Sequence, residues 1–280
     1  MNLILQGLNT DASTIQRIAS LADAQAAIPI NQHAYRCEGV RFSEALKERI
    51  DAACLAAALD YAFVETGRKL TDFKLVAMDM DSTLITIECI DEIADMQGLK
   101  PQVAEITEAA MRGELEFRES LTRRVALLKG LEATALQRVY DERLRLSPGA
   151  ERMLEATKAA GLKSLLVSGG FTFFTDRMKA LLGLDYTHAN LLEIMDGKLT
   201  GHVVGGIVDA DEKKNTVERV CAELGISPQQ AIVMGDGAND LKMMGIAGMS
   251  VAFRAKPIVR GQTDVALNFV GLDGILPLFV

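Results

Sequence analysis

Three short apolar runs, each ending in a polar loop, constrain the fold of this chain more than any other feature. The runs cover 75–78, 162–167 and 231–234, and each has the length of a buried strand. The loops that follow are rich in aspartate, glycine and small polar residues and cover 79–83, 168–170 and 235–240. Helical patterns separate the runs, and strands that alternate with helices predict a parallel sheet. Because ligands bind beyond the carboxyl ends of such strands, we expect the three loops to form one site.

The remaining segments predict two additions to this α/β core, which is expected over 71–85 and 147–280. Between 86 and 146 the strand pattern disappears and amphipathic helical stretches follow one another. A helical insert directly after the first polar loop would lie over the strand ends as a cap and exclude water. Residues 1–70 mix apolar stretches with a helical segment, which predicts a small N-terminal α+β domain.

One helix boundary can be predicted more closely. Ser147 and Pro148 suit the N-cap and the first position of a helix, and Gly161 suits its end just before the second apolar run. We therefore expect a helix between these residues.

Charge and composition narrow the choice of partners. Of the 280 residues 49% are apolar and 24% are charged, which is typical of a folded globular protein. The net charge of −8 opposes binding along a nucleic-acid backbone, although a few cations in a pocket would still bind a small anion. We expect no nucleic-acid partner. The sequence has no run of eighteen uncharged apolar residues and no basic leader. We therefore expect neither a membrane span nor an export signal.

The cysteines give no sign of a zinc site or of a disulfide framework. They show no Cys-x-x-Cys spacing and stand at Cys37, Cys54, Cys89 and Cys221. This usage suits the reducing cytoplasm, where we expect the protein to be located.

The acidic residues of the polar loops predict a site for a hard metal ion. Asp79 and Asp81 project to the same side of an extended strand end, and Asp236 arrives from another strand. Oxygen ligands without histidine or cysteine favour Mg²⁺, especially beside a phosphate, although Mn²⁺ accepts the same set. A single such acid often only caps a helix or forms a turn. Three polar loops in strand-end register indicate a function.

These motifs resemble the ordered motifs of the haloacid dehalogenase superfamily. The resemblance rests on 79–83, 168–170, Lys213 and 235–240. The extension through 84–93 is more closely similar to the phosphoserine phosphatases of that superfamily, and the similarity covers roughly residues 72 to 270. It implies a Rossmann-like α/β core with a helical cap inserted after the first motif.

The resemblance also implies a division of labour between the carboxylates. Asp79 would be the nucleophile and Asp81 the general acid and then the general base. Mg²⁺, one per site, would be held by the Asp79 carboxylate, the Asp81 main-chain carbonyl and Asp236. A serine alkoxide leaves only with a proton, so we expect the pKa of Asp81 to stand above the ordinary value of about 3.9. The implied reaction is the hydrolysis of O-phospho-L-serine through an aspartyl-phosphate, the last step of serine biosynthesis.

Lys213 and the loop of Ser168 and Gly169 are expected to hold the phosphoryl oxygens. Lys213 is preferred to Lys214 because it falls closer to the centre line of the apolar stripe of the following helix. Asn239 is expected to add a contact with the substrate or its phosphate.

Two residues of the predicted cap are candidates for reading the rest of the substrate. Arg124 projects onto an apolar helical face, whereas Arg123 points the opposite way. Such a cation either passes the apolar stripe to reach water or binds an anion such as a substrate carboxylate, and the pattern leaves both open. Glu88 precedes a helix, where an acid often only favours the helix dipole. The resemblance assigns Glu88 to the substrate amino group.

Other functions stay open at this point. A related phosphatase would use the same core on another phosphomonoester such as a sugar phosphate, and a phosphomutase would transfer the group to a second hydroxyl. A regulated or sensing protein would use residues 1–70 as an amino-acid-binding module, which we interpret as a degenerate ACT-like domain. The resemblance implies a homodimer.

A dinucleotide site at 235–240 is not expected, although its glycines are superficially similar to a dinucleotide fingerprint. Asp240 stands where that fingerprint requires a small residue, and an acid there would repel a pyrophosphate. We expect Asp240 to orient its loop and Lys213.

Overall fold

The computed structural model describes residues 1–112 and 114–279, so Gly113 of the predicted cap and Val280 lie outside it. Its centre is a parallel sheet in which the three apolar runs form the neighbouring strands β5 (Leu75–Met78), β6 (Lys163–Phe171) and β9 (Ala231–Gly235). The sheet continues on both sides through β7 (Tyr186–Met195), β10 (Met249–Phe253) and β11 (Val265–Leu267). The predicted α/β fold with a parallel sheet is confirmed.

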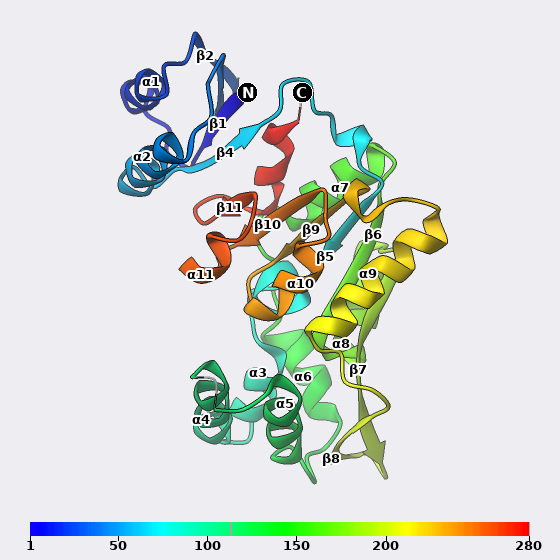
Figure 1. Ribbon diagram of the computed structural model, residues 1–280. Helices are drawn as coiled ribbons and strands as arrows, with labels where there is room; N and C mark the ends of the chain where they lie inside the picture. Colours follow the sequence, from blue (N-terminus) through cyan, green and yellow to red (C-terminus); the bar gives the residue numbers. More distant parts are fainter. Residues whose placement is uncertain (113, 280) are drawn as a thin grey trace.

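Helices cover both faces of this sheet. Successive side chains of a strand point to opposite faces, so neighbouring residues of β5 pack against different helices. Leu75 and Ala77 pack against α9 (Ala210–Leu224) and α10 (Leu241–Met244). Val76 and Met78 belong to the cluster that includes α7 (Ala150–Ala159), α8 (Thr172–Leu182) and the 3-10 helix Leu272–Leu278 (Figure 1). Burying each large apolar side chain contributes about 1.5–3 kcal/mol, so the three-layer arrangement fixes the strand ends that carry the polar loops.

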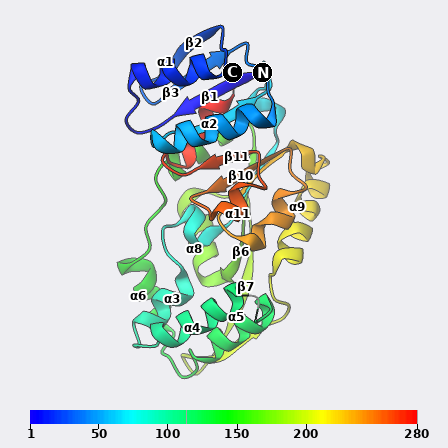
Figure 2. The ribbon, with the colours of Figure 1, turned by 60° about the vertical axis from the view of Figure 1, so that its left-hand side comes forward.

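The helical insert follows β5, as predicted. It consists of α3 (Cys89–Asp95), α4 (Lys100–Met111), α5 (Phe117–Ala126) and α6 (Thr134–Glu142), gathered at one end of the molecule (Figures 1 and 2). Its buried side chains, among them Val103 and Leu121, belong to the same apolar cluster as one face of the sheet. A hairpin that the sequence analysis did not predict, made by β7 and β8 (Lys198–Val204), runs beside α5.

The N-terminal part is an α+β unit. Its elements are β1 (Asn2–Gln6), α1 (Ala12–Leu21), β2 (Ala26–Asn31), β3 (Ala34–Glu38), α2 (Glu44–Ala56) and β4 (Asp60–Val64). The strands are antiparallel in the order β2-β3-β1-β4, and both helices contribute to a separate apolar cluster with β1. β4 pairs with β11, so one sheet of eleven strands runs through the described chain.

A buried carboxylate fastens the N-terminal unit to the core. Asp60 accepts the backbone N–H groups of Asn268, Phe269 and Val270 at 2.8, 2.9 and 3.0 Å. These bonds satisfy consecutive donors of the segment after β11.

Two local expectations differ from the structure. α7 begins at Ala150 with Gly149 as its N-cap, so the predicted start at Ser147 and Pro148 is wrong, although the helix ends just before Gly161 as expected. Gly149 has φ +78°, and a Cβ there would meet the Asp273 side chain, so the approach of a distant segment sets this boundary. The predicted loop 168–170 lies inside β6, where the pairing with β7 shifts register.

Candidate active site

Asp79 stands at the carboxyl end of β5 and is 5% exposed. Its Oδ1 accepts the N–H of Met80 at 2.7 Å, and its carbonyl accepts the N–H of Leu84 at 3.3 Å. The chain turns back at Ser82, whose φ of 56° is in the left-handed region. This wide turn presents the Asp79 carboxylate beyond the sheet.

Lys213 lies fully buried between two carboxylates. Its Nζ is 2.7 Å from Asp79 Oδ2 and 2.7 Å from Asp240 Oδ1. Burial works against the ammonium, but Asp240 and Asp79 outweigh it, so the pKa of Lys213 is raised and the side chain stays charged. Burial and Asp240 in turn raise the pKa of Asp79, while Lys213 opposes them. A single cation thus ties the first strand end to the third.

Asp236 completes an acidic group with Asp79 and Asp240. One carboxylate oxygen of each lies within 4.8 Å of the others. Asp236 Oδ1 accepts the hydroxyl of Thr83 at 3.2 Å, and burial together with the charges of Asp240 and Glu88 raises the pKa of Asp236 to about 7. Such a concentration of oxygen ligands is suited to a hard divalent cation.

Asp81 is half-buried on the other side of the turn. Burial and the charge of Glu88 raise its pKa well above the ordinary value, although hydrogen bonds from Cys89 oppose the shift. Its Oδ1 has no hydrogen-bond partner among the described residues. A Cβ on Gly170 would lie 3.0 Å from Asp81 Oδ2, so the glycine leaves space for this carboxylate. The environment therefore favours the protonated form of the Asp81 carboxyl group more than water would.

The second loop is held by its own hydrogen bonds. Ser168 is buried, and its Oγ accepts the N–H of Gly170 at 2.9 Å. The Gly169 carbonyl accepts the side chain of Asn190 at 2.8 Å. Asn239, from the third loop, is half-buried. The three loops therefore converge, as the strand order predicted.

Glu88 and Arg124 enter from the cap side. Ser82 donates its hydroxyl to Glu88 Oε1 at 2.6 Å. Water reaches the Glu88 side chain, yet the surrounding protein displaces enough solvent to raise its pKa. Arg124 is half-buried, and burial lowers its pKa while Asp91, Glu88 and Asp81 act in the opposite direction. A carboxyl group and a cation from the cap thus stand close to each other and to Asp81.

Comparison with known proteins is consistent with this geometry. The family model of haloacid dehalogenase-like hydrolases matches residues 73–248. A phosphoserine phosphatase of Polaromonas sp. is 61% identical over 215 residues, which are 75% of this chain and 91% of that protein. The chain belongs to the phosphoserine phosphatase family of haloacid dehalogenase-like hydrolases.

Solved structures of this family share the fold. A haloacid dehalogenase family hydrolase from Salmonella enterica serovar Typhi aligns with a TM-score of 0.91 and 34% identity, covering 100% of this chain and 99% of that one. A phosphoserine phosphatase with an analogue of the phospho-aspartyl intermediate aligns with a TM-score of 0.70 and 39% identity, covering 74% of this chain and 99% of that one. Among the helices that the structure describes in this chain, none is both long and apolar enough to cross a membrane.

Two residues of this phosphatase site were missed in the sequence analysis. Thr83 binds Asp236 from a distant segment, and no local pattern marks that contact. Asp91 is the strongest charged influence on Arg124, and it lies in the first turn of α3, three residues after the N-cap Glu88. That spacing would have been a usable signal.

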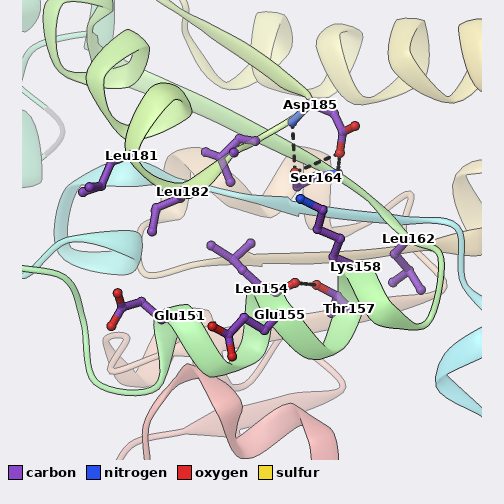
Figure 3. Close-up of a pocket in the computed structure, with 12 residues that line it drawn as sticks. Glu151, Leu154, Glu155, Thr157, Lys158, Leu162, Ser164, Leu181, Leu182 and Asp185 are labelled. Carbon is purple, nitrogen blue, oxygen red and sulfur yellow. Dashed lines mark hydrogen bonds between the residues drawn. The ribbon is translucent and has the colours of Figure 1, made fainter.

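Two cavities lie away from these carboxylates. One of about 200 Å³ lies between α7 and the end of α8, with Lys158 and Asp185 on its walls (Figure 3). The other, of about 640 Å³, separates α2 and β4 from the short helix α11 (Pro257–Arg260). Among the described residues, those that line them include none of the predicted site residues.

Proposed function

We propose that this chain hydrolyses O-phospho-L-serine to L-serine and phosphate through an aspartyl-phosphate on Asp79. The buried contact of Asp79 with Lys213, at 2.7 Å, carries the proposal. It provides a nucleophile and a cation for the phosphoryl group at one strand end, in a family whose Polaromonas member is a phosphoserine phosphatase.

Two steps follow from the positions of the carboxylates. In the first, an Asp79 oxygen forms a bond to phosphorus while the bond from phosphorus to the serine oxygen breaks, and Asp81 gives its proton to that oxygen. Lys213 balances the charge on the phosphoryl oxygens, and Ser168, Gly169 and Asn239 complete their binding. In the second, the oxygen of a water molecule attacks phosphorus while Asp81 takes a proton from that water. The bond between phosphorus and the Asp79 oxygen then breaks. Phosphate leaves, and both aspartates return to their starting states.

The acidic group fits Mg²⁺. We assign the metal to the ligands that the family resemblance implies, which are the carboxylates of Asp79 and Asp236 and the main-chain carbonyl of Asp81. Oxygens of the Asp79 and Asp236 carboxylates lie within 4.8 Å of each other, which supports this assignment. When bound, the ion would supply charge stabilisation to the phosphoryl oxygens.

Thr83→Val tests this assignment through the residue that orients Asp236. We expect the Mg²⁺ concentration for half-maximal activity to rise by roughly 10-fold or more, because losing a partner of a metal ligand typically weakens binding 10- to 100-fold. Titration of phosphate release with Mg²⁺ measures the shift. Thr157→Val, which removes a buried hydroxyl on α7, is the matched control. Equal Mg²⁺ requirements in both variants would contradict the assignment of Asp236.

The cap residues Glu88 and Arg124 are proposed to bind the substrate amino and carboxylate groups. Arg124 faces the acids Asp91 and Glu88, so an incoming carboxylate meets a cation and an ammonium group meets anions. Together they would distinguish phosphoserine from simpler phosphomonoesters.

Arg124→Met tests whether Arg124 binds the carboxylate of the substrate. We expect kcat/KM for phosphoserine to fall roughly 10- to 100-fold, because a hydrogen bond to a charged group contributes about 1.5–3 kcal/mol. O-phosphoethanolamine lacks the carboxylate, so its kcat/KM should stay unchanged. Arg123→Met, on the exposed side of α5, is the control and should alter neither substrate.

Other outcomes of the same assays are informative. If Arg124→Met lowers kcat/KM equally for both substrates, Arg124 does not bind the substrate carboxylate. If the unaltered enzyme prefers a sugar phosphate, the hydrolase chemistry stays and the substrate assignment changes.

We further propose a division into an N-terminal domain over 1–70, a cap over 86–146 and a core over 71–85 and 147–280. The separate apolar cluster of the N-terminal unit supports the first boundary. A cytoplasmic location is proposed because all four cysteines are buried and free, and a homodimer is proposed from the family resemblance.

A further inference from the structure

The first turn of α5 reaches from the cap to the helix that carries Lys213. Arg118 Nε lies 2.6 Å from Asp209 Oδ2. Asp209 is the N-cap of α9, where its other carboxylate oxygen accepts the N–H of Glu212 at 3.0 Å. The N–H of Lys213 donates to the Asp209 carbonyl at 2.9 Å. One aspartate therefore both begins the lysine helix and binds the cap.

The residue before Arg118 approaches the second active-site loop. A Cβ on Gly169 would lie 2.9 Å from Phe117 Cζ and 3.5 Å from the Val208 carbonyl. The absence of a side chain at Gly169 thus lets the Phe117 ring lie close to this loop, immediately beside the start of α9. The same end of α5 meets two of the elements that build the site.

The ion pair is unequal in its exposure. The Arg118 side chain is 60% exposed, whereas that of Asp209 is 14% exposed. Burial disfavours the Asp209 carboxylate, but the Glu212 N–H and Arg118 outweigh it, so the pKa of Asp209 is lowered and the group is charged at neutral pH. A short, charge-assisted bond at a partly desolvated oxygen is stronger than an ordinary surface pair.

We propose that Arg118 and Asp209 form a latch that holds the cap closed over Asp79 and ties closure to the start of the Lys213 helix. The inference rests on the proposed phosphatase function. Arg118 is a positioning residue, because it acts through Asp209. When the pair breaks, the Glu212 N–H still binds the other Asp209 carboxylate oxygen, so the cap is released from α9 while the helix keeps its N-cap.

Kinetics of a double-mutant cycle test the latch. Arg118→Gln removes the cation, and Asp209→Asn removes the charge while keeping an N-capping oxygen. We expect each variant to raise KM about threefold to tenfold, with kcat changing less than about twofold, because closure strengthens binding and leaves the reacting groups unchanged. The double variant should be no worse than the more affected single variant. Arg118→Lys should recover part of the loss, and Arg123→Gln should have no effect.

Hydrogen exchange of the resting protein gives a readout that needs no substrate. Amides of α5 should exchange faster in both single variants than in the unaltered protein. Their exchange in the double variant should be no faster than in the single variants. Additive effects on KM, a fall in kcat at constant KM, or unchanged exchange would each overturn the latch. If phosphoserine proves not to be the substrate while exchange shows the coupling, the latch stands and the substrate assignment alone fails.

Discussion

Asp79→Asn is expected to abolish phosphate release from phosphoserine, lowering kcat by roughly four orders of magnitude or more. Asparagine keeps the size of the side chain but cannot form the acyl-phosphate bond. The fold should persist, because Lys213 keeps its buried ion pair with Asp240 at 2.7 Å when the Asp79 charge is removed. Measurement of phosphate release with Mg²⁺, together with circular dichroism, checks both expectations.

The covalent step can be examined separately from turnover. Rapid acid quenching with ³²P-labelled phosphoserine should leave label on the unaltered protein and none on Asp79→Asn. Asp196→Asn is a suitable control, because Asp196 is exposed in a hairpin turn with φ 49°, a conformation that asparagine tolerates. Residual labelling of Asp79→Asn would place the phosphoryl group on another residue.

The sequence predicted those parts of the site that follow from strand order. Asp79, the loop of Ser168 and the loop of Asp236 each stand where an apolar run ends, and parallel pairing brings such ends to one edge. Helical phase also distinguished two lysines, since Lys213 is fully buried whereas the Lys214 side chain is 38% exposed. Periodicity succeeds here because the apolar face of a helix is determined locally.

Contacts between distant segments were not predictable in this way. Thr83 and Asp236 are separated by 153 positions, and Arg118 and Asp209 by 91, so no local spacing relates them. The start of α7 depends on the approach of Asp273 to Gly149, again a tertiary effect. The roles of Glu88 and Arg124 remain predictions, because each depends on where a substrate binds.

Lys213→Met is expected to affect both activity and stability. Without the ammonium, Asp79 and Asp240 face each other as buried carboxylates with no cation between them. Losing one partner of a buried ion pair typically costs about 3–5 kcal/mol, so we expect the free energy of unfolding, measured in urea without Mg²⁺, to fall by that amount. kcat should fall by roughly 10³-fold, as for the loss of a charge-stabilising donor.

Two comparisons separate the buried charge from a general effect of the helix. Lys214→Met changes the neighbouring lysine, whose exposed pair with Glu218 contributes little, and should leave both quantities near those of the unaltered protein. Adding Asp79→Asn to Lys213→Met should restore part of the lost stability but none of the activity, because one unpaired carboxylate is removed together with the nucleophile. Equal destabilisation by the two lysine variants would instead mean that Lys213 supports α9 without balancing charge at the site.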